Sequence, residues 1–220
     1  MVKHLAYTCV KSEGGILPYD LLQRVAASDR DLAGTRPEDY HLLPRERIDE
    51  GVTRAWTRAL GAWAALREAM DKLPKSDLLT RPTREFLLVL LQELGYGRVP
   101  ASGGLHVDDK DFAISHLHGH TPMHLLGWRV DLDKRQAGIA GAAQASPHGL
   151  VQDFFNRSDK HLWGYVSNGA LFRVLRDHPQ PDAPCLRRVR SRGDVRAAAL
   201  RRIPLAVAGV PRVAPRGRTA

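Results

Sequence analysis

The sequence is poor in cysteine and in long apolar runs, and each shortage excludes a class of protein. Its 220 residues include only two cysteines, Cys9 and Cys185, so neither a disulfide framework nor a cysteine metal cluster is expected. No apolar run approaches the roughly 20 residues needed to span a bilayer, and the first residues do not form a secretory signal. These shortages predict a soluble cytoplasmic protein with no membrane partner.

Acidic residues are nearly missing from the C-terminal segment. Residues 185–220 contain ten arginines, no lysine and a single acid, Asp194, so this segment carries the whole formal charge of +9. It also lacks Phe, Tyr and Trp. Two interpretations of residues 178–220 stay open. Because Arg, Ala, Pro and Gly have GC-rich codons, the segment can be an out-of-frame ending, and it can also be a disordered basic arm that meets nucleic acid.

The first part of the chain has the pattern of a helical subdomain. Apolar residues recur every three or four positions over residues 45–73, which predicts one long amphipathic helix. A shorter helix is expected over residues 19–27, and another over residues 83–94 that ends at Gly95. We therefore expect residues 1–94 to form a helical N-terminal subdomain.

The next part, residues 95–177, mixes strands and helices. Short strands are expected over residues 105–107 and 111–114, joined by a tight turn, and a third over residues 124–131. The end of this part contains two further signals. Ser146 and Pro147 are good first residues of a helix, and Asn168-Gly169 between two strand-like runs indicates a hairpin with a type I′ turn. The expected fold is α/β (α+β): a helical subdomain, a small mixed sheet with helices, and an irregular basic tail over residues 178–220.

The stretch from Ser146 to Asp177 reads SPHGLVQDFFNRSDKHLWGYVSNGALFRVLRD. It resembles a signature near the amino-terminal end of large bacterial restriction-modification proteins of the type IIG and phage-defence kind. In that family it precedes an Eco57I-type, adenine-specific DNA methyltransferase core that uses S-adenosylmethionine. The resemblance covers about residues 14–177 and implies an amino-terminal fragment truncated before the methylase core.

The resemblance also implies a role and partners. In the full-length context this region would engage DNA or dock other restriction-modification or defence subunits. Arg157, Lys160, Arg173 and Arg176 are the candidate phosphate contacts, and ordinary solvated arginines are the alternative. The chain has no Pro-Pro dipeptide, hence no base-gripping (N/D)-P-P-(Y/F) motif. Gly138 and Gly141 form a glycine pair that matches the Gly-rich turn of an S-adenosylmethionine site only weakly. We therefore expect no catalytic residue, no cofactor and no enzymatic activity in this chain by itself.

Histidines supply the alternative function. His116, His118 and His120 would share one face of a strand, as zinc ligands do, whereas Gly119 and Pro122 favour a loop. A small metal-dependent hydrolase using the histidines between His116 and His124 is therefore the second hypothesis. A non-catalytic protein-interaction module is the third.

A nuclease core is a further possibility for residues 95–177. Such a core places carboxylates and a lysine around Mg²⁺. Asp108 and Lys110 fit the short acid-x-Lys pattern but fall in a predicted turn. Asp131 and Lys134 follow a predicted strand with the wrong spacing. Hence the sequence predicts at most a degenerate restriction-nuclease-like core without catalysis.

Overall fold

The computed structural model describes residues 10–12, 19–27, 29, 31–32, 36–40, 42–43, 45–177 and 186–190. Its helices are α1 (Tyr19–Ala26), η1 (Pro37–Tyr40, a 3₁₀ helix), α2 (Ile48–Lys72), α3 (Thr80–Leu91), η2 (Gln92–Tyr96, a π-helical turn) and α4 (Pro147–Phe155). Its strands are β1 (Val10–Ser12), β2 (Leu105–Val107), β3 (Lys110–Phe112), β4 (His116–His118), β5 (Thr121–Leu125), β6 (Trp163–Ser167), β7 (Leu171–Arg176) and β8 (Leu186–Arg190). The α/β fold class expected from the sequence is confirmed.

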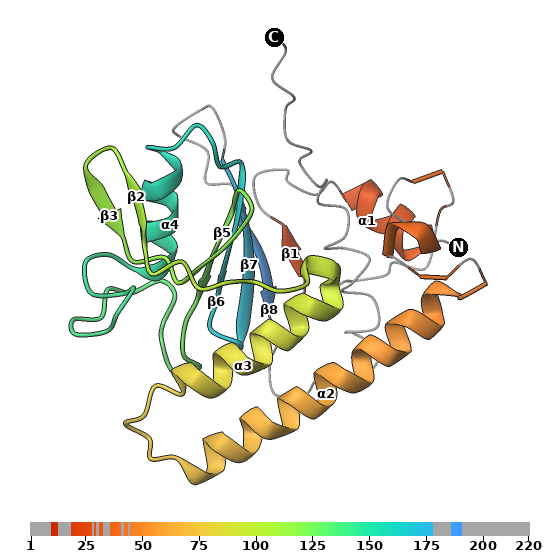
Figure 1. The fold of residues 1–220 in the computed structure, drawn as a ribbon, viewed down its shortest axis with the longest axis horizontal. Coiled ribbons are helices and arrows are strands. Elements are labelled where there is room, and N and C mark those ends of the chain that lie inside the picture. The colour runs from red at the N-terminus through yellow and green to blue at the C-terminus, as the bar shows by residue number, and fades with distance from the viewer. Residues whose placement is uncertain are drawn as a thin grey trace.

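The helices α2 and α3 form an antiparallel hairpin beside the main sheet (Figure 1). α2 buries Trp56 and Leu66 on one stripe, so the predicted long amphipathic helix is confirmed. α3 begins at Thr80, three residues earlier than predicted. The reason is the preceding turn: Leu79 has a left-handed backbone with φ 58°, and its N–H donates to the carboxylate of Asp77 at 2.6 Å.

The main sheet has six strands in the order β1-β8-β7-β6-β5-β4. β5 and β6 are parallel and are connected through α4, whereas the other neighbours are antiparallel. The predicted pair of short strands is a separate hairpin, β2–β3. Its two-residue turn has positive φ at both Asp108 and Asp109, the geometry of a type I′ turn.

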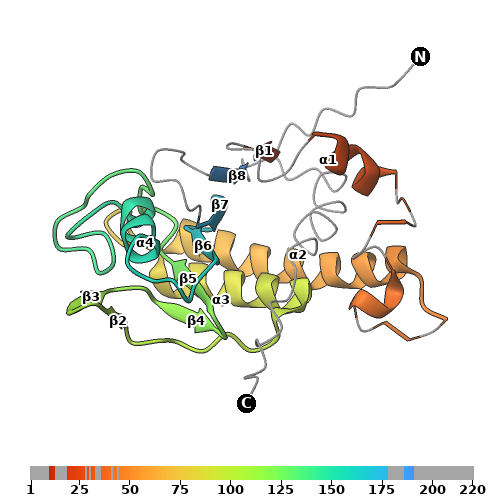
Figure 2. The ribbon, with the colours of Figure 1, turned by 90° about the horizontal axis from the view of Figure 1, so that it is seen from above.

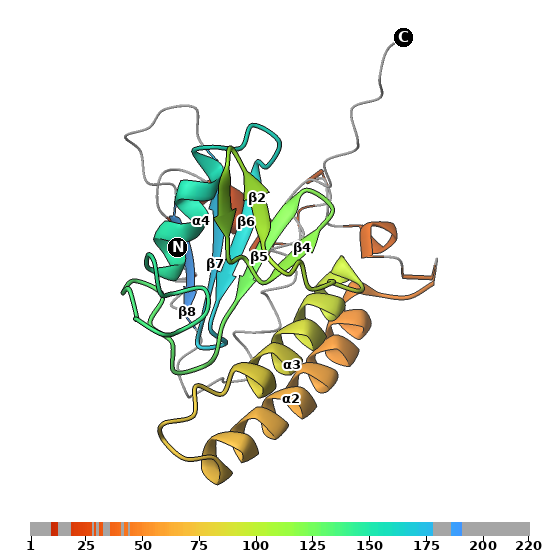
Figure 3. The same cartoon turned by 60° about the vertical axis from the view of Figure 1, so that its left-hand side comes forward.

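Helix α4 begins as the sequence predicts. Ser146 is extended, and its hydroxyl accepts a hydrogen bond from the N–H of Gly149 at 3.1 Å, while Pro147 occupies the first turn. α4 lies on the face of the sheet opposite α2 and α3 (Figures 2 and 3). The molecule therefore has three layers, and the sheet is the middle one.

Each face of the sheet has its own apolar core. Between the sheet and α4 lie buried side chains that include Ile114, Val151, Phe154 and Val166. Between the sheet and α3 lie Leu87, Leu91, Met123, Leu125, Tyr165 and Val174. β6 contributes Val166 to the first core and Tyr165 to the second, because side chains alternate along a strand, and β5 contributes Met123 and Leu125 to the second. Both layers are thus fastened to the same pair of parallel strands.

The predicted strand over residues 124–131 is wrong in its placement, because β5 ends at Leu125. Beyond it the chain turns toward α3. A Cβ at Gly127 would lie 2.1 Å from the carbonyl oxygen of Leu78, so only glycine permits this approach. The N–H of Trp128 then donates to a threonine hydroxyl of α3 at 3.0 Å. These contacts take residues 127–131 out of the sheet although their apolar alternation resembles a strand.

The predicted hairpin forms as β6–β7, but its type I′ turn is wrong. Gly169 has positive φ (81°) and Asn168 does not. The Asn168 side chain instead brackets the turn: its oxygen accepts from the N–H groups of Ala170 and Leu171 at 3.1 and 2.9 Å. Its amide nitrogen donates to the carbonyl of Val130 at 2.8 Å. Asn168 therefore stabilises the turn through side-chain hydrogen bonds and does not adopt the left-handed backbone of a type I′ turn.

One strand falls inside the segment expected to be irregular. β8, at Leu186–Arg190, pairs with β7 on one side and with β1 on the other. These five residues are thus strand, contrary to the expectation for residues 178–220. The rest of that segment lies outside the described residues, so the two interpretations of its origin stay predictions.

Candidate nucleic-acid interface

Three predicted phosphate contacts are exposed: Arg157 and Lys160 in the segment between α4 and β6, and Arg176 at the end of β7. The register pairs Trp163, the first residue of β6, with Arg176, the last residue of β7. The guanidinium carbon of Arg176 lies 5.3 Å from the centre of the Trp163 ring, a cation–π contact that orders the side chain while leaving it exposed. We name Arg157, Lys160 and Arg176 the basic face.

Arg157 is tied to the helix that precedes it. Its Nε donates to the carboxylate of Asp153 at 3.1 Å, and Lys110 of β3 donates to the same carboxylate at 2.5 Å. These hydrogen bonds, first from Lys110 and then from Arg157, lower the pKa of the Asp153 carboxyl. Asp153 stays ionised at neutral pH and offsets part of the positive charge here.

Arg173 is not exposed, contrary to the solvated or phosphate-facing role predicted for it. Its side chain is 1% exposed, and it makes two 2.6 Å hydrogen bonds to the carboxylate of Asp133. A guanidinium buried in a sheet requires such a bidentate partner. Arg173 therefore fastens the loop after β5 to β7 and is removed from the set of candidate DNA contacts.

The three histidines predicted as a zinc site do not all share one face. His116 and His118 alternate along β4 and lie on the same face, but β4 ends at His118 and Gly119 has φ 56°, so the chain turns before His120. His116 is buried with its Nδ1 2.9 Å from the Ser115 hydroxyl. His118 packs against Tyr96 and His120 against His161. Among the described residues, no group of three or more His, Cys, Asp or Glu side chains is placed to hold a metal ion.

Both lysines of the degenerate nuclease hypothesis already contact an acid. Asp108 lies in the β2–β3 turn, and Lys110 binds the carboxylate of Asp153. Lys134 lies 3.5 Å from Asp131 across a loop. Each lysine thus has a separate acidic partner, and the residues do not assemble into one Mg²⁺ site.

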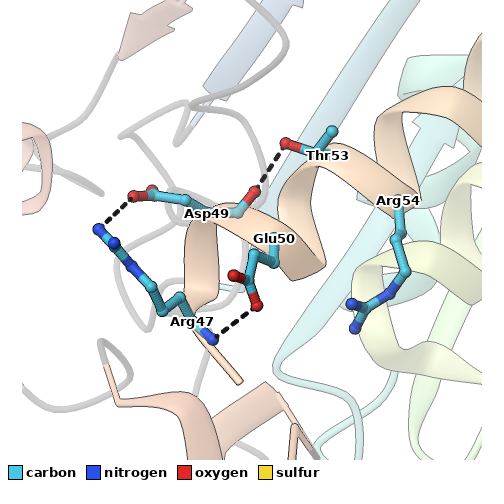
Figure 4. Close-up of a pocket in the computed structure, with 5 residues that line it drawn as sticks. All are labelled: Arg47, Asp49, Glu50, Thr53 and Arg54. Carbon is cyan, nitrogen blue, oxygen red and sulfur yellow. Dashed lines mark hydrogen bonds and ion pairs between the residues drawn. The ribbon is translucent and has the colours of Figure 1, made fainter. Parts of the chain in front are cut away.

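A hollow of about 510 Å³ lies at the start of α2, lined by Arg47, Asp49, Glu50, Thr53 and Arg54 (Figure 4). Its charged groups are already paired. Arg47 lies 3.6 Å from Asp49 and donates its backbone N–H to Glu50, and Arg54 pairs with Glu46 at 2.8 Å. Since acids and bases alternate along this wall, the hollow does not favour a ligand of either charge.

The glycine pair does not fit a cradle for S-adenosylmethionine. Gly141 has φ 80°, and a Cβ there would lie 2.4 Å from the ring of His124. The carbonyl oxygen of Gly141 accepts a hydrogen bond from the Nε2 of His124 at 2.9 Å. This glycine is required for packing against a buried imidazole, so we assign no cofactor contact to it.

Two important contacts could not be predicted from the sequence. The carboxylate of Asp133 that pairs with Arg173 comes from a loop 40 residues away. The stacking of Arg176 on Trp163 depends on a register that the predicted turn would have changed, because a two-residue Asn168-Gly169 turn pairs Trp163 with Val174 instead. The sequence signal for this region was the pattern of polar residues that flank the runs forming β6 and β7.

Comparisons of the chain with known protein families, with curated proteins and with solved structures found no match. Within the part of the chain that the structure describes, no helix combines the length and the apolar character needed to cross a membrane. The fold and the basic face, together with the resemblance of residues 146–177, are therefore the basis for a functional proposal.

Proposed function

We propose that this chain is a non-catalytic, DNA-engaging region of a restriction-modification protein of the adenine-specific methyltransferase type. The observation that carries the proposal is the basic face. Its three exposed cations, Arg157, Lys160 and Arg176, come from the segment that resembles the family signature. The β6–β7 register and the Trp163 ring hold one of them in place.

The chemistry of the basic face is that of phosphate contacts. Arg and Lys side chains neutralise backbone phosphates and release counterions, which gives affinity without sequence preference. In this proposal the chain positions the duplex, while methyl transfer with S-adenosylmethionine is carried out by a methylase core elsewhere in the system. Other restriction-modification or defence subunits are the expected protein partners.

The test is duplex binding by the full chain at several salt concentrations, measured by fluorescence anisotropy. The variant Arg157→Ala/Lys160→Ala/Arg176→Ala removes the basic face. The control variant Arg67→Ala/Lys72→Ala/Arg81→Ala removes three exposed cations from α2 and α3. Each phosphate contact contributes about 0.9 to the slope of log affinity against log salt, so the first variant should flatten the slope by about 2 to 3.

The control variant should leave the slope of the original chain unchanged. Equal losses in both variants would show that the charge of the chain acts diffusely and that the basic face is not a site. Absence of any salt-dependent duplex binding by the original chain would reject DNA engagement and favour a module that binds only a protein partner.

A further inference from the structure

A second cationic group lies at the far end of β5, on the face of the sheet covered by α3. Arg84 of α3 donates its Nε to the carbonyl oxygen of Leu125, the last residue of β5, at 2.9 Å. The side chain is half-buried. This hydrogen bond fixes the guanidinium against the sheet and leaves its other two nitrogens without a hydrogen-bond partner among the described residues.

The same residue of β5 connects Arg84 to His116. The N–H of Leu125 donates to the hydroxyl of Ser115 at 2.8 Å, and that hydroxyl lies 2.9 Å from the Nδ1 of His116. His116 pairs with Met123 across the β4–β5 ladder, so both side chains lie on the α3 face. The Nε2 of His116 has no hydrogen-bond partner in the described part of the chain.

In the described part of the chain, no acid forms an ion pair with this cluster. Among the described residues, Arg84 forms no ion pair, in contrast to Arg81 one turn earlier, which binds Glu85 at 3.0 Å and is almost fully exposed. Burial, and then the charge of Arg84, lower the pKa of His116. The third ionisable neighbour, His124, lies on the opposite face of β5. A half-buried guanidinium without a counter-charge carries a desolvation cost that a bound anion offsets.

We propose that Arg84 and His116 form a binding site for a phosphate-type oxyanion at the C-terminal end of β5. The two unpartnered guanidinium nitrogens match two oxygens of a tetrahedral anion, as arginine does in bidentate phosphate contacts. The Nε2 of His116 supplies a third donor when it carries the proton. The anion is either free phosphate or a phosphate of a nucleic-acid backbone.

This oxyanion site is separate from the basic face. Leu125 pairs with Ser167 at the end of β6, whereas the basic face surrounds Trp163 at its beginning. The two proposals can therefore fail independently. Loss of duplex binding through the basic face leaves the phosphate titration of the oxyanion site unaffected.

The test is an NMR titration of the His116 ring in the full chain with inorganic phosphate, at constant ionic strength set with potassium chloride. Phosphate up to about 10 mM covers the range of a weak site. We expect a saturable shift and a higher pKa of His116, because a bound anion stabilises the imidazolium. Arg84→Gln should weaken phosphate binding at least about tenfold, since a charge-assisted hydrogen bond is lost, and Arg81→Gln should not.

A second titration uses a short DNA duplex at the same total phosphate concentration. A response to inorganic phosphate alone supports a site for free phosphate, and a response to the duplex supports a backbone contact. If neither probe shifts His116 in the unmodified chain, the proposal is overturned, and this result does not depend on the folding of a variant. Equal weakening by Arg84→Gln and Arg81→Gln overturns it as well.

Discussion

Arg173 shows how a single buried charge links a loop to the sheet. Its guanidinium is 1% exposed, and Asp133, which receives both of its hydrogen bonds, is 52% exposed. The Nε of Arg173 has no partner among the described residues. The pair therefore has one desolvated partner and one that water can still reach. Removing Asp133 alone leaves a buried guanidinium without its carboxylate partner, whereas replacing both residues leaves no unpaired buried charge.

For Asp133→Ala we expect a loss of about 2 kcal/mol in the free energy of unfolding, because a charged hydrogen-bond partner of a buried group disappears. The double variant Asp133→Ala/Arg173→Met should recover most of that loss. Urea denaturation of both variants measures this. Asp111→Ala, which removes an exposed carboxylate on β3, is the matched control and should change stability by less than about 0.5 kcal/mol. A double variant as unstable as the single one would contradict the role of the pair.

His124 is the buried titratable group of β5. It is 1% exposed, its Nε2 donates to the carbonyl of Gly141, and its Nδ1 has no partner among the described residues. Burial lowers the pKa of His124 from 6.5 to about 4. The folded chain therefore keeps this imidazole neutral under conditions in which an unfolded chain protonates it.

This difference predicts a loss of stability in acid. Above pH 6.5 both states are neutral at His124 and its contribution is complete. As the pH falls toward 4, His124 binds a proton in the unfolded state but not in the folded state, so the free energy of unfolding decreases by up to about 3 kcal/mol. In His124→Gln, which keeps a donor for Gly141, the decrease between pH 7 and pH 4 should be smaller by about that amount. Chemical denaturation at both pH values measures it, with the exposed His106→Gln as control.

A result in which His124→Gln and the original chain lose stability in parallel would assign the acid sensitivity to other groups. The carboxyls whose pKa the fold lowers, such as Asp153, also destabilise the chain when they are protonated. They are unchanged in both proteins, so the comparison isolates the imidazole.

At the scale of the element, the β6–β7 turn depends on one glycine. Gly169 has φ 81°, and a Cβ there would lie 2.9 Å from the Thr83 side chain and 3.1 Å from the Trp128 ring. Gly169→Ala should therefore cost more than about 1 kcal/mol through strain and crowding. Gly61→Ala is the matched control, since Gly61 lies in α2 and a Cβ added there would have no atom within 4 Å; it should stabilise the chain by about 0.5 to 1 kcal/mol. Thermal unfolding of the two variants should show opposite signs.

The elements differ in how well the sequence predicts them, for local reasons. α4 was predictable because Ser146 caps it and Pro147 starts it, both within a few residues. The end of β5 was not, because the approach of Gly127 to Leu78 is a tertiary contact with α3. The burial of Arg173 was missed for the same reason, since its partner lies in a distant loop.

The candidate sites show the same division. The sequence pattern identified the segment that holds the basic face, and Arg157, Lys160 and Arg176 are exposed as phosphate contacts must be. No local pattern indicated Arg84, because the hydrogen bond of Arg84 to Leu125 joins two elements 41 residues apart. Contacts between neighbours in the chain are encoded by local pattern, whereas contacts across layers depend on how the layers pack.

At the scale of the whole molecule, the sheet is the element on which both other layers depend. α2 and α3 cover one face and α4 covers the other (Figures 2 and 3). At one edge of the sheet, β1 joins the other strands through β8, because β8 lies between β1 and β7. β8 therefore covers the backbone N–H and C=O groups of β7, which would otherwise form a free edge.

A chain that ends at residue 185 lacks β8 and should self-associate, because β7 then presents an unpaired edge and β1 loses the strand with which it pairs. A chain that ends at residue 190 keeps β8 but lacks the later arginines. Comparing the two shortened chains therefore distinguishes the effect of losing β8 from the effect of losing the basic segment that follows it. Size-exclusion chromatography with light scattering should find oligomers or aggregates of the first and a species like the full chain for the second. If both shortened chains match the full chain in size and melting temperature, β8 contributes nothing to the stability of the sheet.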